Sequence, residues 1–234
     1  MKNLFLLLFI AVNSIFAQTN VIKYNNSPAL PDDYKEKLKN LSNEKKELYS
    51  KLLSGHNEET KQLSYSLKFN DTVSSFETDP ILLKNSSLNM DSQKYYYINN
   101  NNATVLVQQT IANQKFIIEK ELPKWSIENV SKTISGYKVI KATAMVKRYT
   151  SKEGINEAQV EAWFAPELPF SFGPIGFGGL PGLIFDLKFL GSHYSIIDID
   201  LSNSYEKISQ PKKGKKIREN ELPEVYKKLY STYN

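Results

Sequence analysis

The stretch FSFGPIGFGGLPGLIFDLKF, residues 170–189, contains five of the ten glycines of the chain and two of its ten prolines. Two further prolines, Pro166 and Pro169, lie just before it. Proline fixes φ and lacks an amide N–H, whereas glycine permits positive φ. We therefore expect a shaped loop that cannot pair as a strand before Leu180.

The second half of the stretch alternates in polarity and predicts a half-buried strand. Leu183, Phe185, Leu187 and Phe189 would face one side, and Ile184, Asp186 and Lys188 the other. The loop itself has two interpretations: a tight corner of a curved sheet, which we favour because Gly and Pro mark turns, or a lip that contacts a ligand. It is not a phosphate loop, because neither Lys-Ser nor Lys-Thr follows the glycines.

Outward from this stretch, alternation with a period of two recurs along most of the chain after Lys61. Eight runs show it, with turn residues between them, and the gaps are mostly too short for parallel crossovers. We therefore expect antiparallel pairing, with a turn at Asn99–Asn102. The expected strands are residues 61–69, 94–99, 103–111, 114–120, 137–149, 156–165, 183–190 and 192–201.

Two of these strands present a face whose middle is alanine. Ile140, Ala142, Ala144 and Val146 share one side of the first strand, and Ala158, Val160, Ala162 and Phe164 share one side of the next. Alanine is too small to fill the roughly 10 Å between packed layers. Either a helix packs unusually close to this face, which we favour, or a ligand does.

Two amphipathic helices are expected to cover the sheet. The first spans Pro31–Ser54, where Tyr34 and five leucines recur at helical spacing and Gly55 follows the end. The second spans Glu221–Tyr233. The expected fold class is therefore mainly β: a strongly curved antiparallel sheet, or open half-barrel, with an N-terminal and a C-terminal helix packed on it.

The N-terminus predicts export. MKNLFLLLFIAVNSIFAQ carries one lysine, an apolar run and small residues suited to cleavage after Ala17, and the run is too short for a transmembrane span. We expect a signal peptide over residues 1–17 and a single β-rich domain over 18–234, located in the periplasm and without a transmembrane segment. The chain has no cysteine, which excludes disulfides and thiolate chemistry.

The net charge of +5 is modest, but five cations cluster at Lys212, Lys213, Lys215, Lys216 and Arg218. We favour a solvated connector before the last helix, because charged runs are usually solvated surface. Contact with an acidic membrane surface is the better of the specific interpretations. The expected export makes nucleic acid an unsuitable partner.

Catalytic and metal-binding patterns are weak. Only two histidines occur, His56 and His193, fewer than a zinc enzyme normally uses, and no G-x-S-x-G elbow is present for a serine nucleophile. His193 shares a strand face with apolar residues, which favours packing. Asp198 and Asp200 lie on one strand face, where we favour solvated carboxylates over glycosidase chemistry. We therefore expect no enzyme, no cofactor and no metal.

GLPGLI at residues 179–184, preceded by AWFAPELPFSFGP and YKVIKAT, resembles the GLPGLI family of exported proteins of Gram-negative bacteria, whose function is not established. The similarity covers Tyr137–Phe189. Many members have a cysteine where this chain has Val139, so a thiol-dependent role would not extend to it. The pattern of long strands and helices also resembles the half-barrel of periplasmic lipoprotein-localisation factors. The matching positions are Lys141, Ala142, Trp163, Phe164, Pro169, Gly173, Pro174, Phe177, Gly179, Leu180, Pro181, Gly182, Leu183 and Ile184.

These observations predict a non-catalytic binding protein, a carrier of an apolar or lipid-like ligand held between sheet and helix. The alternative is an accessory protein of an outer-membrane assembly that uses the Gly/Pro-rich loop as a docking surface. The residues predicted to line the ligand site are Ala142, Ala144, Ala162, Trp163, Phe164, Phe170, Phe172, Phe177, Leu180 and Pro181.

Overall fold

One large sheet dominates the computed structural model, which describes residues 19–28, 41–47, 64–78, 94–150, 154–204 and 207–230. Twelve strands form it in the order β12-β6-β5-β4-β3-β2-β1-β11-β10-β9-β8-β7. Neighbouring strands are antiparallel except for β12, which is parallel to β6. The strands are β1 (Thr19–Pro28), β2 (Ser64–Phe69), β3 (Val73–Thr78), β4 (Tyr95–Asn99), β5 (Thr104–Ile111), β6 (Gln114–Lys120), β7 (Ser126–Ile134), β8 (Tyr137–Thr150), β9 (Gly154–Ala165), β10 (Leu183–Phe189), β11 (Ser192–Ser204) and β12 (Lys215–Arg218).

All eight predicted strands are present, and four further strands were not predicted. β1, β3 and β7 are rich in polar residues and show little alternation, so their sequences resemble connections. β12 falls within the basic run that we interpreted as a solvated connector, and that interpretation is wrong for residues 215–218. These strands form because neighbouring strands supply their hydrogen-bonding partners, which cannot be recognised from the local sequence.

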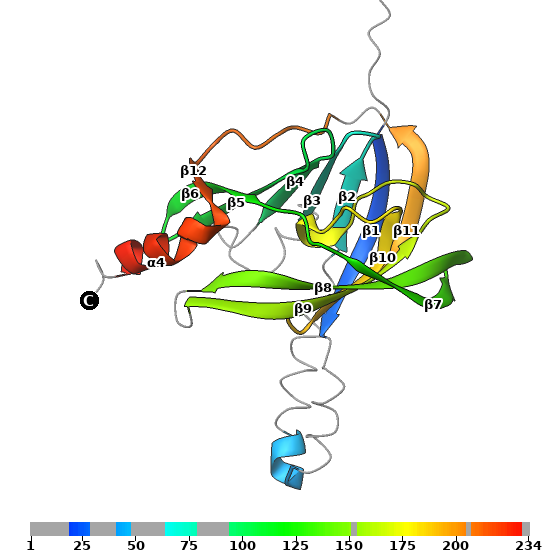
Figure 1. Cartoon of the computed structure of the whole chain (residues 1–234), viewed down its shortest axis with the longest axis horizontal. Helices are drawn as coiled ribbons and strands as arrows, with labels where there is room; N and C mark the ends of the chain where they lie inside the picture. The colour runs from blue at the N-terminus through cyan, green and yellow to red at the C-terminus, as the bar shows by residue number, and fades with distance from the viewer. Residues whose placement is uncertain are drawn as a thin grey trace, which may run out of the picture.

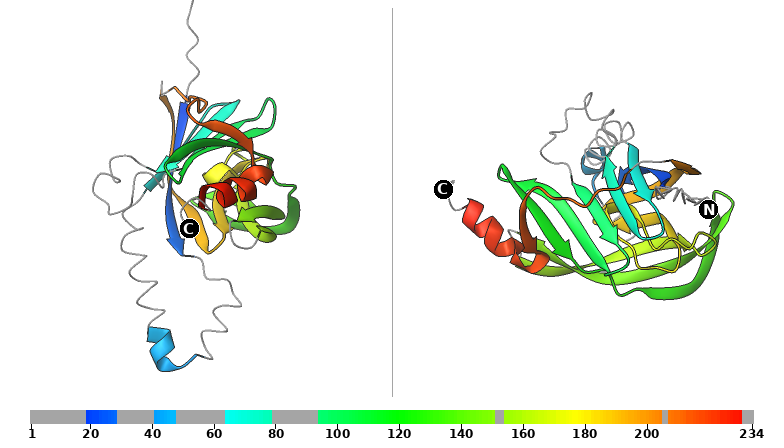
Figure 2. Two further views of the ribbon diagram at one scale, coloured as in Figure 1. Left: turned by 90° about the vertical axis from the view of Figure 1, so that its left-hand side faces the viewer. Right: turned by 90° about the horizontal axis from the view of Figure 1, so that it is seen from above.

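The sheet curves strongly, so that one end of it lies opposite the other. Figure 1 shows β8 and β9 running across the direction of β1 and β2, and the views in Figure 2 show the sheet curling into a bowl. β7 and β12 are its two edges, so the described sheet is open. We call the concave side the inner face; it carries Ile22, Tyr24, Leu67, Phe69 and Phe76, all buried.

The Gly/Pro loop, residues 166–182 between β9 and β10, folds into this concave side. Its single helical turn, η2 (Pro174–Gly176), contacts β3, β4 and β5, which are far from it in sequence. Trp125 Nε1 donates a hydrogen bond of 2.8 Å to the Gly178 carbonyl, and the Ile184 amide donates one of 3.0 Å to the Phe172 carbonyl. The loop therefore forms part of the core and is more than the simple corner that we favoured.

The prediction of a simple half-buried strand after the loop is wrong. Ile184 pairs with Phe164, but Asp186 pairs with Trp163, so Phe185 is an extra residue in a bulge. A bulge of one residue exchanges the two faces beyond it. As a result, β10 is buried from Leu183 to Leu187, including Asp186.

Helices contribute less than predicted. The expected C-terminal helix is present as α4 (Leu222–Tyr230), preceded by the turn η3 (Glu219–Glu221). Leu222 of α4 is buried in a small cluster with Phe116, Ile118 and Ile217. Among the described residues, the longest helices fall short of what a bilayer crossing requires, in length and in apolar character.

The expected helix Pro31–Ser54 is not supported as a cover for the sheet. Within this span, the structure describes only residues 41–47. Residues 43–47 are helical, and the side chains of residues 42–47 are exposed. The rest of this span, and the predicted signal peptide, lie outside the described residues. The only described helix of more than two turns, α4, packs beside Tyr149 near one end of β8 instead of over the alanines.

Candidate functional site

The alanine-centred face forms as predicted. Ile140 pairs with Phe164, Ala142 with Ala162 and Ala144 with Val160, so these side chains share the inner face of β8 and β9. The same core cluster contains Phe172, Phe177 and Leu180 of the Gly/Pro loop. Loop side chains, and not a helix, thus fill the core to which the alanines belong.

The ten predicted site residues divide by position. Eight contribute to one core cluster on the inner side: Ala142, Ala144, Ala162, Phe164, Phe172, Phe177 and Leu180 are buried, and Phe170 is half-buried with its ring centroid 4.8 Å from that of Phe69. Pro181 is exposed. Trp163 is on the outer face, paired across the strands with Lys141 and Asp186, and it also packs against this cluster.

The inner face also carries a cluster of tyrosines that we did not predict. Tyr65, Tyr96 and Tyr194 come from β2, β4 and β11 and surround Phe76, with ring centroids 5.7, 6.1 and 5.9 Å from its centroid. Tyr65 also makes an edge contact of 5.5 Å with Tyr194. The three strands alternate with β3 and β1 in the sheet, and the rings meet because each tyrosine occupies an inward position of its strand. We call these three residues the tyrosine cluster.

The phenol groups of the cluster lie close enough to influence one another. Burial raises the pKa of Tyr194 far above its ordinary value, and the neighbouring Tyr65 and Tyr96 raise it further. Burial likewise raises the pKa of Tyr96, with a further increase from Tyr65. Burial also raises the pKa of Tyr65, against a smaller lowering from its hydrogen bond with the Asn26 side chain, so all three hydroxyls are uncharged at neutral pH. Beside them, the side-chain oxygen of Asn26 is buried and has no hydrogen-bonding partner among the described residues.

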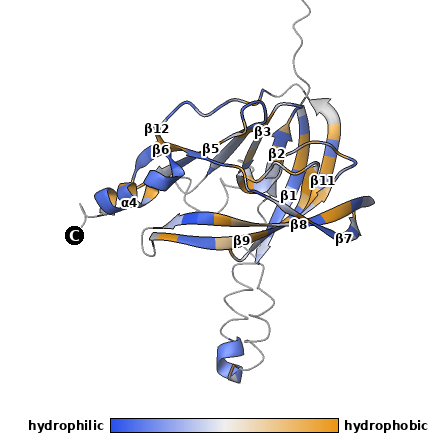
Figure 3. Cartoon of the chain, in the orientation of Figure 1, coloured by the Kyte–Doolittle hydropathy of each residue, from blue (hydrophilic) through white to orange (hydrophobic). Residues whose placement is uncertain are grey.

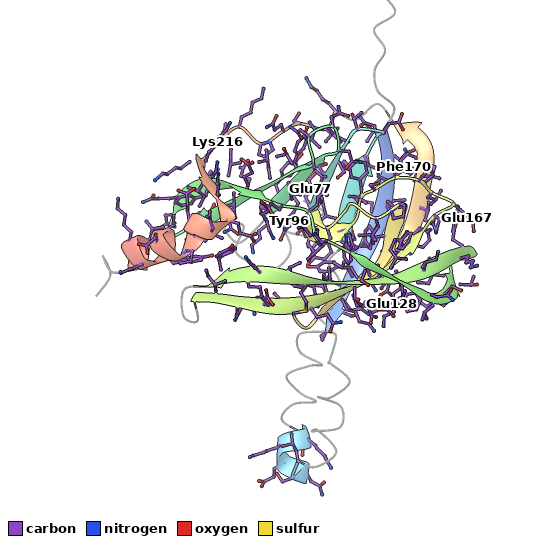
Figure 4. The ribbon with its side chains drawn as sticks, in the orientation of Figure 1. Glu77, Tyr96, Glu128, Glu167, Phe170 and Lys216 are labelled. Carbon is purple, nitrogen blue, oxygen red and sulfur yellow. The ribbon has the colours of Figure 1, made fainter. Side chains whose placement is uncertain are left out.

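Burial of the inner face decreases from the Gly/Pro loop toward the tip of the β8–β9 hairpin. Phe172 and Leu180 are 0% and 1% exposed, whereas Val146 and Ala158 are only half-buried. Tyr96 packs against both the main core and the small cluster that includes Tyr149 and α4. Figure 4 shows Tyr96 on the side of the upper strands that faces β8. Tyr96 thus lies between the main core and the less buried part of the inner face.

On the outer face, the buried Asp186 contacts His193. Its Oδ2 lies 2.8 Å from His193 Nε2, while its buried Oδ1 has no described partner. His193 is therefore paired with a carboxylate and not packed among apolar residues as predicted. The Ser195 hydroxyl donates to Asn25 Oδ1 at 2.5 Å and not to His193, so these residues do not form a Ser-His-Asp triad.

A chain of ion pairs crosses the same face beside Trp163. Lys141 Nζ lies 3.2 Å from Glu161 and 3.5 Å from Glu128, and Lys188 Nζ lies 3.4 Å from Glu161. The hydrogen bond to Glu161 raises the pKa of Lys141. Burial alone would raise the pKa of Glu161, but the hydrogen bond from Lys141 and the charge of Lys188 lower it overall. These ion pairs link β7, β8, β9 and β10 across the outer face.

Other candidate groups are also satisfied or exposed. Asp198 and Asp200 are exposed in the second half of β11. The described residues contain no cluster of three or more His, Asp or Glu side chains placed to hold a metal ion. His56 lies outside the described residues.

The tyrosine cluster had a weak signal in the sequence. The three tyrosines of the run YYYI at residues 95–98 alternate between the two faces of a strand. Only the pairing of Tyr96 with Phe76 of β3 assigns Tyr96 to the inner face. Tyr65 and Tyr194 are distant in sequence and meet only through the strand order. The strand order β4-β3-β2-β1-β11 is therefore required to find the cluster.

Comparison with known proteins supports the family resemblance and the fold. Residues 146–186 match a family model described as "Protein of unknown function (Porph_ging)", the GLPGLI-type family. Two solved structures, "Structure of PNGF-II in P21 space group" and "Structure of PNGF-II in C2 space group", each match with a TM-score of 0.52 over 91% of this chain, at 18% and 19% identity. This chain spans about a third of their length, 33% and 32%. No curated protein matches the sequence. The resemblance to lipoprotein carriers is not confirmed.

Proposed function

We propose that this protein is an exported, non-catalytic binding protein. Its ligand has an apolar body and a hydrogen-bonding head, and it binds at the tyrosine cluster opposite the outer part of the β8–β9 hairpin. The observation that carries the proposal is the convergence of three tyrosines from three strands on the inner face, where Tyr96 adjoins the less buried part. An acyl chain with a carboxylate or ester head has this chemistry.

Three features support this ligand class. Aromatic rings provide large apolar contact area, and their hydroxyls provide donors at fixed positions. The unpartnered Asn26 oxygen adds an acceptor beside them. The small side chains Ala144 and Ala158 on the facing hairpin leave more room than larger residues would. The Gly/Pro loop, by contrast, is packed in the main core through Phe172, Phe177 and Leu180.

The test is native mass spectrometry of the chain from residue 18, purified without detergent from an envelope fraction, followed by lipid extraction. We expect a discrete stoichiometric adduct that extracts as a lipid. Tyr65→Phe combined with Tyr194→Phe should weaken binding of the extracted ligand about 3- to 10-fold per lost hydrogen bond. Tyr97→Phe is the matched control, since Tyr97 lies in a separate cluster with Leu106 and Ile117. A bare mass that stays bare after incubation with lipid vesicles would exclude the proposal.

The second candidate is an accessory protein that binds a partner, and a different surface now favours it. The Gly/Pro loop fits a docking role poorly, because Phe172 and Phe177 are buried. β7 is an edge strand, and its Ile127 and Val130 are 52% and 48% exposed. Exposed edges with apolar residues are suited to accepting a strand from a partner.

Because the chain has no cysteine, one substitution creates a unique crosslinking position on β7. Asn129→Cys, which lies at an exposed position of β7, should capture one defined envelope protein, and Val130→Lys should reduce that capture. Glu157→Cys, exposed on β9, is the control position. Equal capture from both positions would argue against a β7 partner.

A further inference from the structure

Residues 207–218, KISQPKKGKKIR, carry six positive charges and no negative charge. All six cationic residues are exposed: Lys207, Lys212, Lys213, Lys215, Lys216 and Arg218. None of them forms an ion pair with another described residue. We call this segment the basic edge, because it ends in β12 at one edge of the sheet.

The basic edge is held in place by its non-charged residues. Pro211 and Ile217 are buried, and Ile208 packs against Tyr97, Leu106 and Ile117. The Tyr95 hydroxyl donates a hydrogen bond of 2.8 Å to the Ser209 carbonyl. A merely solvated connector would not need these contacts. They hold six cations at defined positions along one edge of the molecule.

One glycine allows this close approach. Gly214 has a φ of +142°, and a Cβ there would lie 3.0 Å from the Lys115 carbonyl oxygen. β12 can therefore lie beside β6, with Ile217 opposite Ile118 and the flanking cations exposed. Figure 4 shows Lys216 on the outer margin of the molecule, and Figure 3 shows a nearly continuous hydrophilic strip along this segment.

We infer that the basic edge docks the protein on the surface of an anionic phospholipid bilayer. A row of fixed, unpaired cations matches a surface of uniform negative charge, which attracts basic segments without a shaped pocket. Lys227 and Lys228 of the adjoining helix α4 are also exposed, next to the half-buried Tyr226. Tyrosine and lysine together suit a membrane–water interface.

A nucleic acid fits the same segment less well. Single-stranded nucleic acids bind where aromatic side chains are interleaved with cations and stack on the bases. Residues 207–218 contain no aromatic residue. This inference stands on the exposed cations of residues 207–218 and not on a ligand at the tyrosine cluster, so it does not depend on the proposed ligand.

The experiment measures cosedimentation of the chain from residue 18 with vesicles of phosphatidylcholine that contain about 30% phosphatidylglycerol, at low and at physiological salt. We expect binding to these vesicles, weaker binding at higher salt, and none to pure phosphatidylcholine. Substituting Lys212, Lys213, Lys215 and Lys216 with glutamine should lower the affinity at least about 50-fold.

The matched control removes four exposed lysines elsewhere, Lys45, Lys124, Lys138 and Lys147, also by glutamine. Both variants lose four positive charges. If the position of the charges decides binding, the affinity of the control for the vesicles should stay within about 3-fold of that of the unmodified chain. Equal losses in the two variants would overturn the inference. The inference would also be overturned if the chain bound both kinds of vesicle equally or bound neither. It would be overturned as well if a single-stranded oligonucleotide displaced the chain from the vesicles at a phosphate concentration below that of the anionic lipid.

Discussion

At the scale of single residues, the most consequential features lie in the stretch from Phe170 to Phe189. The extra residue Phe185 exchanges the faces of β10 and takes Asp186 into a buried pair with His193. Glycines have a second role there, which is to allow backbone contact. A Cβ on Gly182 would lie 2.3 Å from the Ala165 carbonyl oxygen, and one on Gly173 would lie 2.7 Å from Ile184.

Gly182→Ala should therefore lower the free energy of unfolding by at least about 2–3 kcal/mol, because the backbone around residue 182 and around Ala165 would have to move apart. Gly136→Ala is the comparison: its Cβ would meet nothing within 4 Å, and only the positive φ of +84° is unfavourable. We expect a cost of about 1 kcal/mol there. Urea unfolding of both variants checks this, and equal costs would show that the close contact at Gly182 is not limiting.

At the scale of elements, the Gly/Pro loop and α4 cover different parts of the sheet. The loop joins the main core, whereas α4 and β12 enclose a smaller cluster formed with β5 and β6. The cluster of Phe116, Ile118, Ile217 and Leu222 thus connects the basic edge to the rest of the sheet.

Leu222→Ala should lower the free energy of unfolding by about 2–3 kcal/mol, since the side chain is 7% exposed and its removal leaves a cavity. Leu229→Ala, at a half-buried position of the same helix, should cost clearly less. Denaturant unfolding followed by circular dichroism measures both. A negligible cost for Leu222→Ala would mean that α4 is not anchored to the sheet.

At the scale of the whole molecule, the curved sheet buries phenol groups that would ionise in water. Burial raises the pKa of Tyr24, Tyr96 and Tyr194 far above the ordinary value of 10.0. The folded state then keeps its protons at a pH where the unfolded state releases them. The stabilisation is complete below about pH 10 and is lost as the pH rises beyond it.

We therefore expect the midpoint of urea unfolding to fall steeply above about pH 10. Near-ultraviolet absorbance of phenolate should show one group of tyrosines that ionises normally and a second that ionises only as the protein unfolds. Tyr24→Phe removes a hydroxyl that donates a hydrogen bond to the Ile184 carbonyl. It should lower the free energy of unfolding at neutral pH, because the hydrogen bond is lost, and it should reduce the loss of stability above about pH 10, because one buried phenol no longer ionises on unfolding. Normal titration of every tyrosine would contradict the buried cluster.

The sequence by itself determined the class of fold and most of its strands, because alternation of polarity is a local property. It also located the Gly/Pro loop, the alanine-centred face and the C-terminal helix. It could not show β1, β3, β7 or β12, whose residues are stabilised by partners distant in the chain.

Only the tertiary structure decided what fills the concave side and which residues meet there. The bulge at Phe185 reversed a face that alternation had assigned correctly up to that point. The curvature of the sheet brought Tyr65, Tyr96 and Tyr194 together from three strands, and parallel pairing with β6 turned a basic run into an edge. Each of these depends on strand register and sheet curvature, which arise from long-range pairing and are not encoded in any short segment.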